Sequence, residues 1–418
     1  MSEEKFMNGK IDWLSRLKLR VSYGLTGNNK INDYGFVDLL YGGNYSFGSG
    51  NGNVNSGLNT NPNLIANTQI TWERTKQVNY GLDVAAFKNR VNLAVDVYSS
   101  TTEALLLQQP SMAFTGGLFF NNNIGRIQNS GVEVELSSIN VTTKRFKWTT
   151  ALNFSRNKNN IIELGKELLI LNQGERTELY LNQPGNPLIQ FFGYKTDGVW
   201  LSQQEIIDAQ AKGLTTTLGS TVFVPGGLKL VDVNGDNVID ANDRTVIGNP
   251  YPKFTWGITN SFNYQSFDLS FTFQGVQGGN LINGDRNYNE SRRYIKEYTE
   301  NRWISPANPG DGKTPYSTIG YNWMLTDYAV EDASYVALRE VLLGYTVNSK
   351  LAKKVGLSGL RVYASAQNLL FFFPSGYKGL NPEARSASSF YASPLIDGYQ
   401  RGGFPTSRSF LFGIDINF

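Results

Sequence analysis

The last ten residues of the chain form a segment in which apolar and polar side chains alternate. Gly413, Asp415 and Asn417 stand between large apolar residues, and the apolar set is Phe410, Phe412, Ile414, Ile416 and Phe418. Because successive side chains of a β-strand point to opposite faces, this segment predicts a strand with one wholly apolar face. A chain that ends on such a strand is typical of an outer-membrane β-barrel, whose strands face lipid on one side and the lumen on the other. The last strand of a soluble β-sandwich is the alternative.

The composition favours many strands over a helical enzyme. Of the 418 residues, 13% are aromatic and 43 are glycine, and the charged share is 17%, below the roughly 25% of ordinary soluble domains. The chain has no cysteine and no histidine. This excludes disulfides, Cys/His zinc sites, Ser-His-Asp or Cys-His catalysis, and haem ligation through these residues. The net charge of +3 is too small to indicate a nucleic-acid partner.

The sequence contains no apolar stretch of the roughly 18 residues that a transmembrane helix needs, whereas the strands of a membrane barrel are short and alternating. Residues 1–6 (MSEEKF) lack the apolar core of a signal peptide. Because a barrel protein must be exported, we expect the chain to be the C-terminal part of a longer protein or a shortened form of one.

Alternating segments recur along the whole chain. In residues 91–97 the odd positions are apolar, and in residues 267–274 large apolar residues interleave with Asp268, Ser270, Thr272 and Gln274. This period of two predicts strands with one polar face. Ten strands are expected, near residues 14–26, 72–86, 90–102, 126–138, 146–157, 254–264, 267–277, 333–347, 358–370 and 408–418. The predicted fold class is therefore all-β, as part of an antiparallel transmembrane β-barrel.

The connections between these strands alternate in length. Short ones are expected near 87–89, 139–145, 265–266 and 348–357, and long ones near 27–71, 103–125, 158–253, 278–332 and 371–407. Outer-membrane barrels have this asymmetry, with short periplasmic turns and long extracellular loops. A β-sandwich has no reason to place every long loop at one end. If the final strand runs toward the periplasm, all five long connections face the outside of the cell.

Several motifs, in order along essentially the whole chain, resemble those of TonB-dependent outer-membrane receptors. The general resemblance is carried by residues 71–83 (TWERTKQVNYGLD), 89–98 (NRVNLAVDVY) and 123–133 (NIGRIQNSGVE). Three further stretches narrow it to the SusC/RagA branch: residues 191–200 (FFGYKTDGVW), residues 332–345 (DASYVALREVLLGY), and residues 361–369 (RVYASAQNL) followed by 379–383 (GLNPE).

The resemblance implies that residues 1–418 correspond to about the last ten strands of a barrel of roughly 22 strands. Members of this family hold an N-terminal plug in the barrel and import glycans, oligosaccharides or peptides across the outer membrane of Bacteroidetes. TonB supplies the energy through the plug, and a SusD-like surface lipoprotein caps the barrel. The chain departs from this pattern because it lacks the signal peptide, the plug and the first half of the barrel. We expect the missing part on the same or a separate chain, lipid and lipopolysaccharide around the wall, and no transport by this chain alone.

Residues 232–243 (DVNGDNVIDAND) resemble a calcium loop of the EF-hand type. The side-chain ligand positions fall on Asp232, Asn234, Asp236, Asp240 and Asp243, and the backbone carbonyl of Val238 would be a sixth ligand. Carboxylates so close together repel one another unless a cation joins them, and hard oxygen ligands suit Ca²⁺.

Two departures from the calcium-loop pattern count against this interpretation. Asn237 replaces the usual glycine, and Asp243 replaces the longer glutamate, as in dockerin-like loops. We predict a structural Ca²⁺ that stiffens the longest extracellular loop, residues 158–253. A solvated acidic turn with local hydrogen bonds is the alternative.

Three other features carry weaker hypotheses. Loop aromatics could stack on sugar rings or pack within the loops; they are Tyr41, Tyr45, Phe47, Trp200, Phe371, Phe372 and Phe373. Residues 201–212 predict a short amphipathic helix capped by Ser202, with Glu205 at the capping-box position. Residues 351–355 predict a periplasmic turn with a basic face, for which solubility is a sufficient explanation.

Three functions were weighed. The sequence favours an outer-membrane nutrient importer of SusC type that is not an enzyme. The alternative is a soluble extracellular carbohydrate-binding β protein with a dockerin-like calcium loop, but its polar faces would have to be packed dry, which is costly. A carboxylate-based hydrolase is disfavoured because no convincing Asp/Glu pair is present.

Overall fold

The computed structural model describes residues 11–29, 36–37, 40–47, 53–60, 64–110, 119–165, 169–173, 178–289, 296–316, 324–354, 356–379, 381–384, 395–401 and 403–418. Within this part of the chain no helix is long and apolar enough to cross a membrane.

Ten long strands form one continuous antiparallel sheet, and they are the ten strands that the alternation predicts. Neighbours in sequence are hydrogen-bonded neighbours in space, and the two-residue strand β4 (Leu64–Ile65) joins β7 in parallel. The strands are β1 (Leu14–Asn28), β5 (Glu73–Ala86), β6 (Val91–Pro110), β7 (Phe119–Thr142), β8 (Phe146–Glu163), β17 (Phe254–Tyr264), β18 (Phe267–Gln277), β21 (Tyr335–Thr346), β22 (Gly359–Phe372) and β24 (Ser409–Asn417). Because all ten belong to one sheet, the sandwich alternative is wrong.

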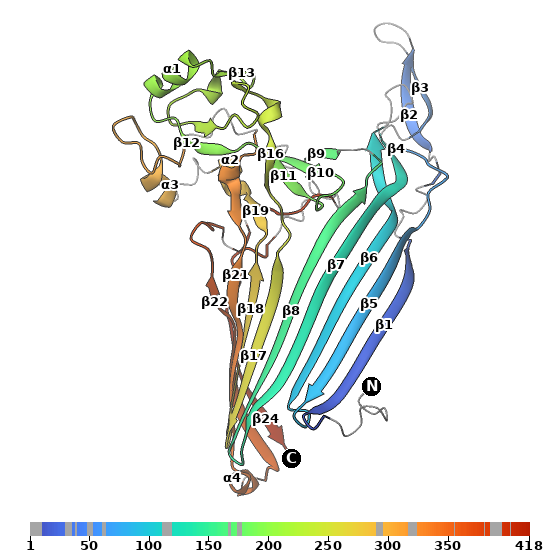
Figure 1. Cartoon of the computed structure of the whole chain (residues 1–418), viewed down its shortest axis with the longest axis vertical. Coiled ribbons are helices and arrows are strands. Elements are labelled where there is room, and N and C mark those ends of the chain that lie inside the picture. Colours follow the sequence, from blue (N-terminus) through green and yellow to red (C-terminus); the bar gives the residue numbers. More distant parts are fainter. Residues whose placement is uncertain are drawn as a thin grey trace.

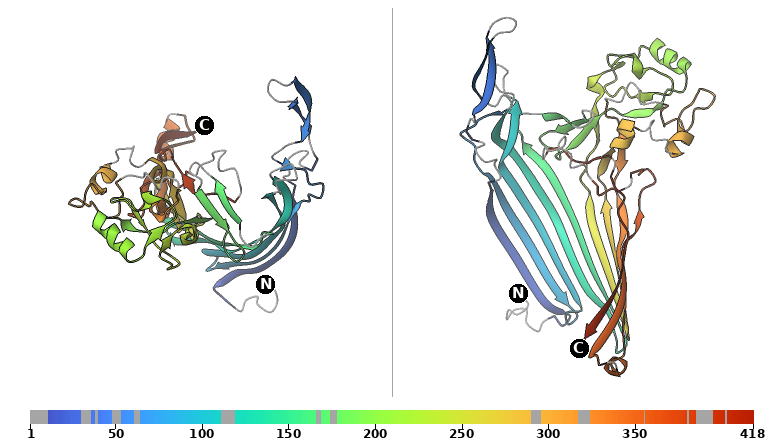
Figure 2. Two further views of the ribbon diagram at one scale, coloured as in Figure 1. Left: turned by 90° about the horizontal axis from the view of Figure 1, so that it is seen from above. Right: turned by 180° about the vertical axis from the view of Figure 1, so that it is seen from behind.

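The sheet is a tall, curved wall with two open edges. Seen from above, it bends around one side of the molecule (Figure 2). Among the described residues, β1 and β24 each pair with a single long strand, β5 and β22 respectively. The wall is therefore part of a barrel rather than a closed one.

The short connections lie together at one end of the wall, as predicted. Phe87, Lys88 and Asn89 turn the chain between β5 and β6 with φ of 55°, 57° and 64°, and Gln265 does so between β17 and β18 with φ of 53°. The connection between β21 and β22 contains the helix α4 (Ser349–Lys354) at the lower tip of the molecule (Figure 1).

One predicted long connection is wrong. The expected loop 103–125 is mostly strand, because β6 continues to Pro110 and β7 begins at Phe119. The ladder passes two irregularities around Leu105, next to Ala104 with φ of 58°, and then resumes. Leu107 of this extension is 5% exposed and belongs to a hydrophobic core shared with the long loops, so packing against those loops stabilises the longer strands.

Register places apolar residues from neighbouring strands in rows on one face of the wall. Leu19, Leu82, Val95, Val134 and Phe154 face one another across β1, β5, β6, β7 and β8. Their neighbours in sequence form polar rows on the opposite face. A one-residue slip would exchange the two faces, so the alternation specifies the register.

Most of the buried core lies in the long loops at the other end of the wall, where it also includes Leu107 and Ile161 from the upper ends of β6 and β8. Tyr180, Phe191 and Ile282 are completely buried there, and Tyr399 is 2% exposed, whereas Phe412 of the wall is 81% exposed. The long loops form two small sheets: one contains β16 (Thr245–Gly248), β11 (Gln190–Gly193), β10 (Glu178–Asn182) and β9 (Leu169–Gln173), and the other contains β20 (Val330–Asp332), β19 (Asn280–Asn283) and β23 (Tyr399–Gln400). Two strand pairs accompany them, β12 (Thr196–Val199) with β14 (Leu228–Leu230) and β13 (Thr215–Thr216) with β15 (Val238–Ile239). The loops also contain the helices α1 (Gln203–Ala211), α2 (Gly284–Asn289) and α3 (Lys296–Asn301). We call this assembly the loop domain.

The loop between β1 and β5 is separate from the loop domain. It carries the antiparallel hairpin of β2 (Leu40–Phe47) and β3 (Asn53–Thr60), which projects above the β1 side of the wall (Figure 1).

Packing in the wall predicts different effects on stability for two glycine-to-alanine changes. Trp256 lies opposite Gly275, and its indole ring occupies the space that a Cβ would need, whereas nothing lies within 4 Å of that position at Gly24. We expect Gly275→Ala to destabilise the barrel by about 1–3 kcal/mol through overpacking, and Gly24→Ala to be neutral or slightly stabilising. The measurement is the temperature at which the full-length protein loses its folded band on unboiled SDS gels. Equal midpoints for the two variants would contradict this packing.

Candidate functional site

Arg20 of β1 bridges the polar face across two strands. Its guanidinium forms ion pairs with Asp83 of β5 at 2.9 Å and with Asp96 of β6 at 2.7 Å, and Asn79 donates a further hydrogen bond to Asp96. Gly81 faces Arg20 in the register, and the guanidinium lies over it. Because Gly81 has no side chain, Arg20 can extend over β5 and reach Asp96 on β6.

Near the other edge of the wall, a second arginine also pairs with carboxylates on two different strands. Arg361 of β22 pairs with Asp268 of β18 at 2.7 Å and with Asp415 of β24 at 3.0 Å. Its guanidinium passes over Gly344 of the intervening strand β21. Such partly exposed pairs each contribute little to stability, but they show that this face is built for water rather than for a dry interface.

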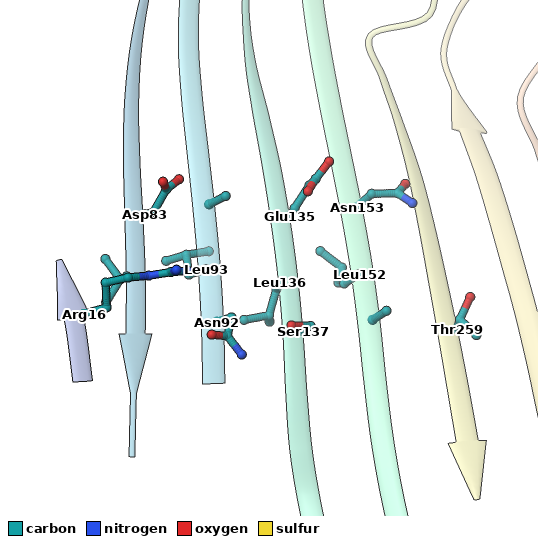
Figure 3. A pocket seen from close by; sticks show the side chains of 13 residues that line it. Arg16, Asp83, Asn92, Leu93, Glu135, Leu136, Ser137, Leu152, Asn153 and Thr259 are labelled. Carbon is teal, nitrogen blue, oxygen red and sulfur yellow. The ribbon is translucent and has the colours of Figure 1, made fainter. Parts of the chain in front are cut away.

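The polar face is hollowed in the lower half of the wall. A cavity of about 320 Å³ is lined by 13 residues of β1, β5, β6, β7, β8 and β17. Asp83, Glu135 and Asn153 lie along its upper side at similar height on three strands (Figure 3). A second cavity of about 310 Å³ shares Asn92 and Thr259 with it. Hollows on this face indicate that the polar side is the concave side of the wall, which is the side that faces a barrel lumen.

A cluster around Arg339 joins β21, β22 and the last long loop. Arg339 donates hydrogen bonds to Gln274 at 2.6 Å and to Asn368 at 3.0 Å, and it pairs with Glu383. The hydroxyl of Tyr335 also donates to Glu383, at 2.6 Å. We call this set the Arg339 cluster.

A β-bulge places Arg339 in this cluster. The register shifts between Leu338 and Glu340, so Arg339 has no direct partner in the ladder on either side. A bulge re-aims side chains, and here it turns Arg339 toward Gln274, on the same face as Glu340. Arg339, Asn368 and Glu383 lie in three separate sequence motifs, and no sequence pattern links them because the bulge and the folded loop bring them together.

Glu331 of β20 also joins distant parts of the chain, and no motif or period in the sequence predicts this role. The residue is 4% exposed, and its carboxylate accepts hydrogen bonds from Asn283 at 2.9 Å and from the backbone N–H of Lys378 at 3.0 Å. The guanidinium of Arg286 lies 3.5 Å away. A buried carboxylate is stable only when paired and hydrogen-bonded, so Glu331 ties the loop after β18 to the loop after β22.

The acidic turn 232–243 has the hydrogen bonds of a self-supporting turn. Backbone N–H groups donate to Asp232 from Gly235 and Asn237, both at 2.7 Å, and Asn237 has φ of 64°. Asp243 is completely buried and accepts from Val233 and Asp240, both at 2.8 Å. Asn237 thus adopts the left-handed conformation that the usual glycine of a calcium loop would supply.

The remaining predicted side-chain ligands of this turn also accept local hydrogen bonds. Asn234 accepts from the N–H of Asp236, Asp236 from that of Val238, and Asp240 from that of Asn242. Across the residues that the structure describes, no group of three or more Asp, Glu, His or Cys side chains is placed to hold a metal ion. Calcium binding at Asp232, Asn234, Asp236, Val238, Asp240 and Asp243 stays a prediction.

The predicted helix near 201–212 is present as α1, with Ser202 as its N-cap. The carboxylate of Glu205 accepts from the N–H of Leu201 and from Lys229, at 2.8 and 3.0 Å. Burial lowers the pKa of Lys229, but the hydrogen bond to Glu205 and the charges of Glu205 and Asp197 outweigh it, so this pKa lies above its ordinary value.

The candidate loop aromatics differ in exposure. Trp200 is 1% exposed and donates through Nε1 to the carbonyl of Val222, so it packs inside the loop domain. Phe371 stacks on Phe373, whereas Tyr41 and Phe372 are exposed. The side chains of Tyr45 and Phe47 lie outside the described residues.

The fold and the polar concave face define the class of this protein: it is a wall segment of an outer-membrane type β-barrel. None of the protein-family models searched matches the chain. Along its whole length the chain is 32% identical to TonB-dependent receptor P3 and 31% identical to TonB-dependent receptor P39, both of Formosa agariphila. It is 26% identical to the TonB-dependent receptor SusC of Bacteroides thetaiotaomicron.

The chain spans less than half the length of these relatives, namely 41%, 42% and 39%. The solved structure of the RagAB peptide transporter matches 99% of the chain with a TM-score of 0.74, at 23% identity and over 42% of that chain; this likeness shows the fold. The chain therefore resembles the SusC/RagA-type TonB-dependent receptors, and it corresponds to the C-terminal portion of their barrel.

The Arg339 cluster predicts a measurable coupling between wall and loop. We expect Arg339→Ala and Glu383→Ala each to destabilise the last long loop, and the double variant to cost less than the sum by about 0.5–3 kcal/mol. Lys313→Ala is a control because Lys313 is exposed and forms no ion pair among the described residues. Rates of limited proteolysis within residues 373–408 of the intact receptor report the effect. Strict additivity would show that the pair is not coupled.

The acidic turn predicts a second contrast. Asp243→Ala leaves two backbone N–H groups without an acceptor and should destabilise the loop domain by about 2 kcal/mol without added metal, whereas Asp236→Ala, at an exposed position, should cost little. If Ca²⁺ binds, it should protect the unmodified turn from proteolysis, and both variants should lose that protection. Equal proteolysis of the unmodified protein with calcium and with chelator would refute the calcium prediction.

Proposed function

We propose that this chain forms the C-terminal wall and the extracellular loops of an outer-membrane importer of SusC type. The observation that carries the proposal is the single antiparallel sheet with one apolar face, one polar concave face and folded loops at one end only. An apolar face this large, including Val21, Tyr23 and Phe412 at 72%, 65% and 81% exposure, is stable in contact with lipid and unstable in water.

The open edges of the wall require partner strands. In a bilayer, backbone N–H and C=O groups that lack partners cost several kcal/mol each, so membrane sheets are closed. We therefore infer that strands of the same receptor pair with β1 and β24 and complete the barrel, consistent with relatives more than twice as long as this chain. Transport belongs to the complete protein.

The resemblance to SusC/RagA-type receptors suggests both the energy source for transport and a lipoprotein that covers the barrel. We infer that TonB acts through a plug domain in the missing part and that a SusD-like lipoprotein sits over the loop domain. The protein would be in the outer membrane, surrounded by lipid and lipopolysaccharide. The names of the relatives describe receptors and a transporter, which supports a role in uptake rather than catalysis.

The substrate is an oligosaccharide or a peptide. RagAB is named as a peptide transporter. The cavity on the wall offers the amides of Asn92 and Asn153, the hydroxyls of Ser137 and Thr259, and the carboxylate of Glu135. These groups can hydrogen-bond sugar hydroxyls or peptide amides through direct or water-mediated contacts.

The test is uptake by the source bacterium after deletion of the full-length gene. We expect loss of growth on one oligosaccharide or peptide class from a panel, and its return when the intact gene is supplied. A copy without the TonB-contacting segment should localise to the outer membrane but fail to restore growth. Affinity purification of the intact protein should recover a surface lipoprotein. A protein that fractionates as soluble without detergent would overturn the proposal.

A further inference from the structure

The short-turn end of the wall carries an excess of positive charge. Its four turns, residues 87–90, 143–145, 265–266 and 347–358, contain no Asp or Glu. They contain seven basic residues: Lys88, Arg90, Lys144, Arg145, Lys350, Lys353 and Lys354. The rest of the chain has 31 basic and 35 acidic residues, given totals of 38 and 35. The positive net charge of the chain therefore resides at this end.

These basic side chains are available to a partner. All seven residues are exposed, and none of them forms an ion pair among the residues that the structure describes. Arg90 alone is tied down, because its guanidinium donates to the carbonyls of Ile139 and Asn140. We call the seven residues the basic rim.

A row of aromatic side chains lies next to the basic rim, on the apolar face. Phe146, Tyr264, Phe267 and Tyr345 are direct register partners across β8, β17, β18 and β21. Tyr264 and Phe267 are about half exposed. Aromatic residues at one level of a membrane barrel mark the boundary between hydrocarbon and headgroups.

The aromatic row and the basic rim together fix the height of the rim in a membrane. Lys144 and Arg145 directly precede Phe146 of the row, and the turn that holds Lys350 begins two residues after Tyr345, so these cations lie at or just beyond the headgroup layer. Lys and Arg side chains extend their charged ends toward such a layer while their alkyl stems remain near apolar surface. The helix α4 adds exposed Leu351 between its lysines, while buried Ala352 faces the protein.

We propose that the basic rim binds the phosphate groups of anionic phospholipids in the leaflet that faces the short turns. This inference rests on the membrane placement of the proposed function. Charge complementarity supports it: seven exposed cations without a single acidic neighbour in the turns match a ring of lipid phosphates. The adjoining aromatic row places those cations at the level of lipid headgroups rather than in the aqueous space where a soluble partner would bind.

The test uses the intact receptor in phosphatidylcholine vesicles, with and without a minor fraction of cardiolipin. The variant is Lys350→Gln, Lys353→Gln and Lys354→Gln together. The matched control removes three positive charges from the loop domain through Lys195→Gln, Lys212→Gln and Lys313→Gln. Bound cardiolipin is counted by native mass spectrometry after extraction in an uncharged detergent.

We expect the unmodified protein and the loop control to retain cardiolipin equally, and the rim variant to bind it at least about fivefold more weakly, because each cation near a charged membrane surface contributes to binding. Inorganic phosphate should not displace the lipid. A second rim variant, Lys144→Gln with Arg145→Gln, should weaken binding without altering α4. Equal retention by all variants, equal loss in rim and loop variants, or displacement by inorganic phosphate would overturn the inference. Failure of the unmodified protein to insert into phosphatidylcholine vesicles would instead refute the membrane placement.

Discussion

The structure depends on the requirement that each backbone polar group inside a bilayer finds a partner in a neighbouring strand. The ladder of ten strands meets this requirement strand by strand, and its register fixes which side chains meet lipid. From Leu17 to Leu25 of β1, the pairing with β5 proceeds without a shift. Irregularities occur toward the strand ends or in the upper part of the wall, as at Leu105 and Arg339. At these positions the strands extend beyond the membrane, so unbroken pairing of backbone polar groups is no longer required.

On the polar face, glycines leave room for long side chains that link non-neighbouring strands, and the backbone ladder stays intact. Arg20 and Arg361 reach two strands because Gly81 and Gly344 leave room beneath them. Tyr98 crosses Gly131 in the same way to donate to Asn157. Long side chains thereby bind non-neighbouring strands to one another on the side that faces water.

Local elements of the structure could be predicted from the sequence, whereas contacts between residues far apart in the chain could not. A period of two over nine or more residues is a local signal, so all ten wall strands and the four short turns could be predicted. The cap of α1 by Ser202 was predictable for the same reason. The extension of β6 and β7 was not, because Leu107 of β6 is buried by residues from distant loops, and no local period reports such contacts.

The candidate site was predictable only in its separate pieces. Arg339 and Glu383 are 44 residues apart and meet through a bulge and a folded loop, and Glu331 joins loops that begin on different strands. No periodicity reports such contacts. The polar character of the concave face, in contrast, followed directly from alternation.

The loop domain is assembled from more than one loop. The N–H of Tyr194 donates to the carbonyl of Leu325, and the side chain of Thr196 donates to Asp327. β23 from the last loop pairs with β19 from the loop after β18. One hydrophobic core contains Phe191, Ile282 and Tyr399, each from a different loop. Exchange of a single loop between related receptors would therefore remove part of a shared core. The transplantable module, in evolution or in engineering, is the set of three loops together with the upper ends of the wall strands that contact them, such as Leu107 of β6 and Arg339 of β21.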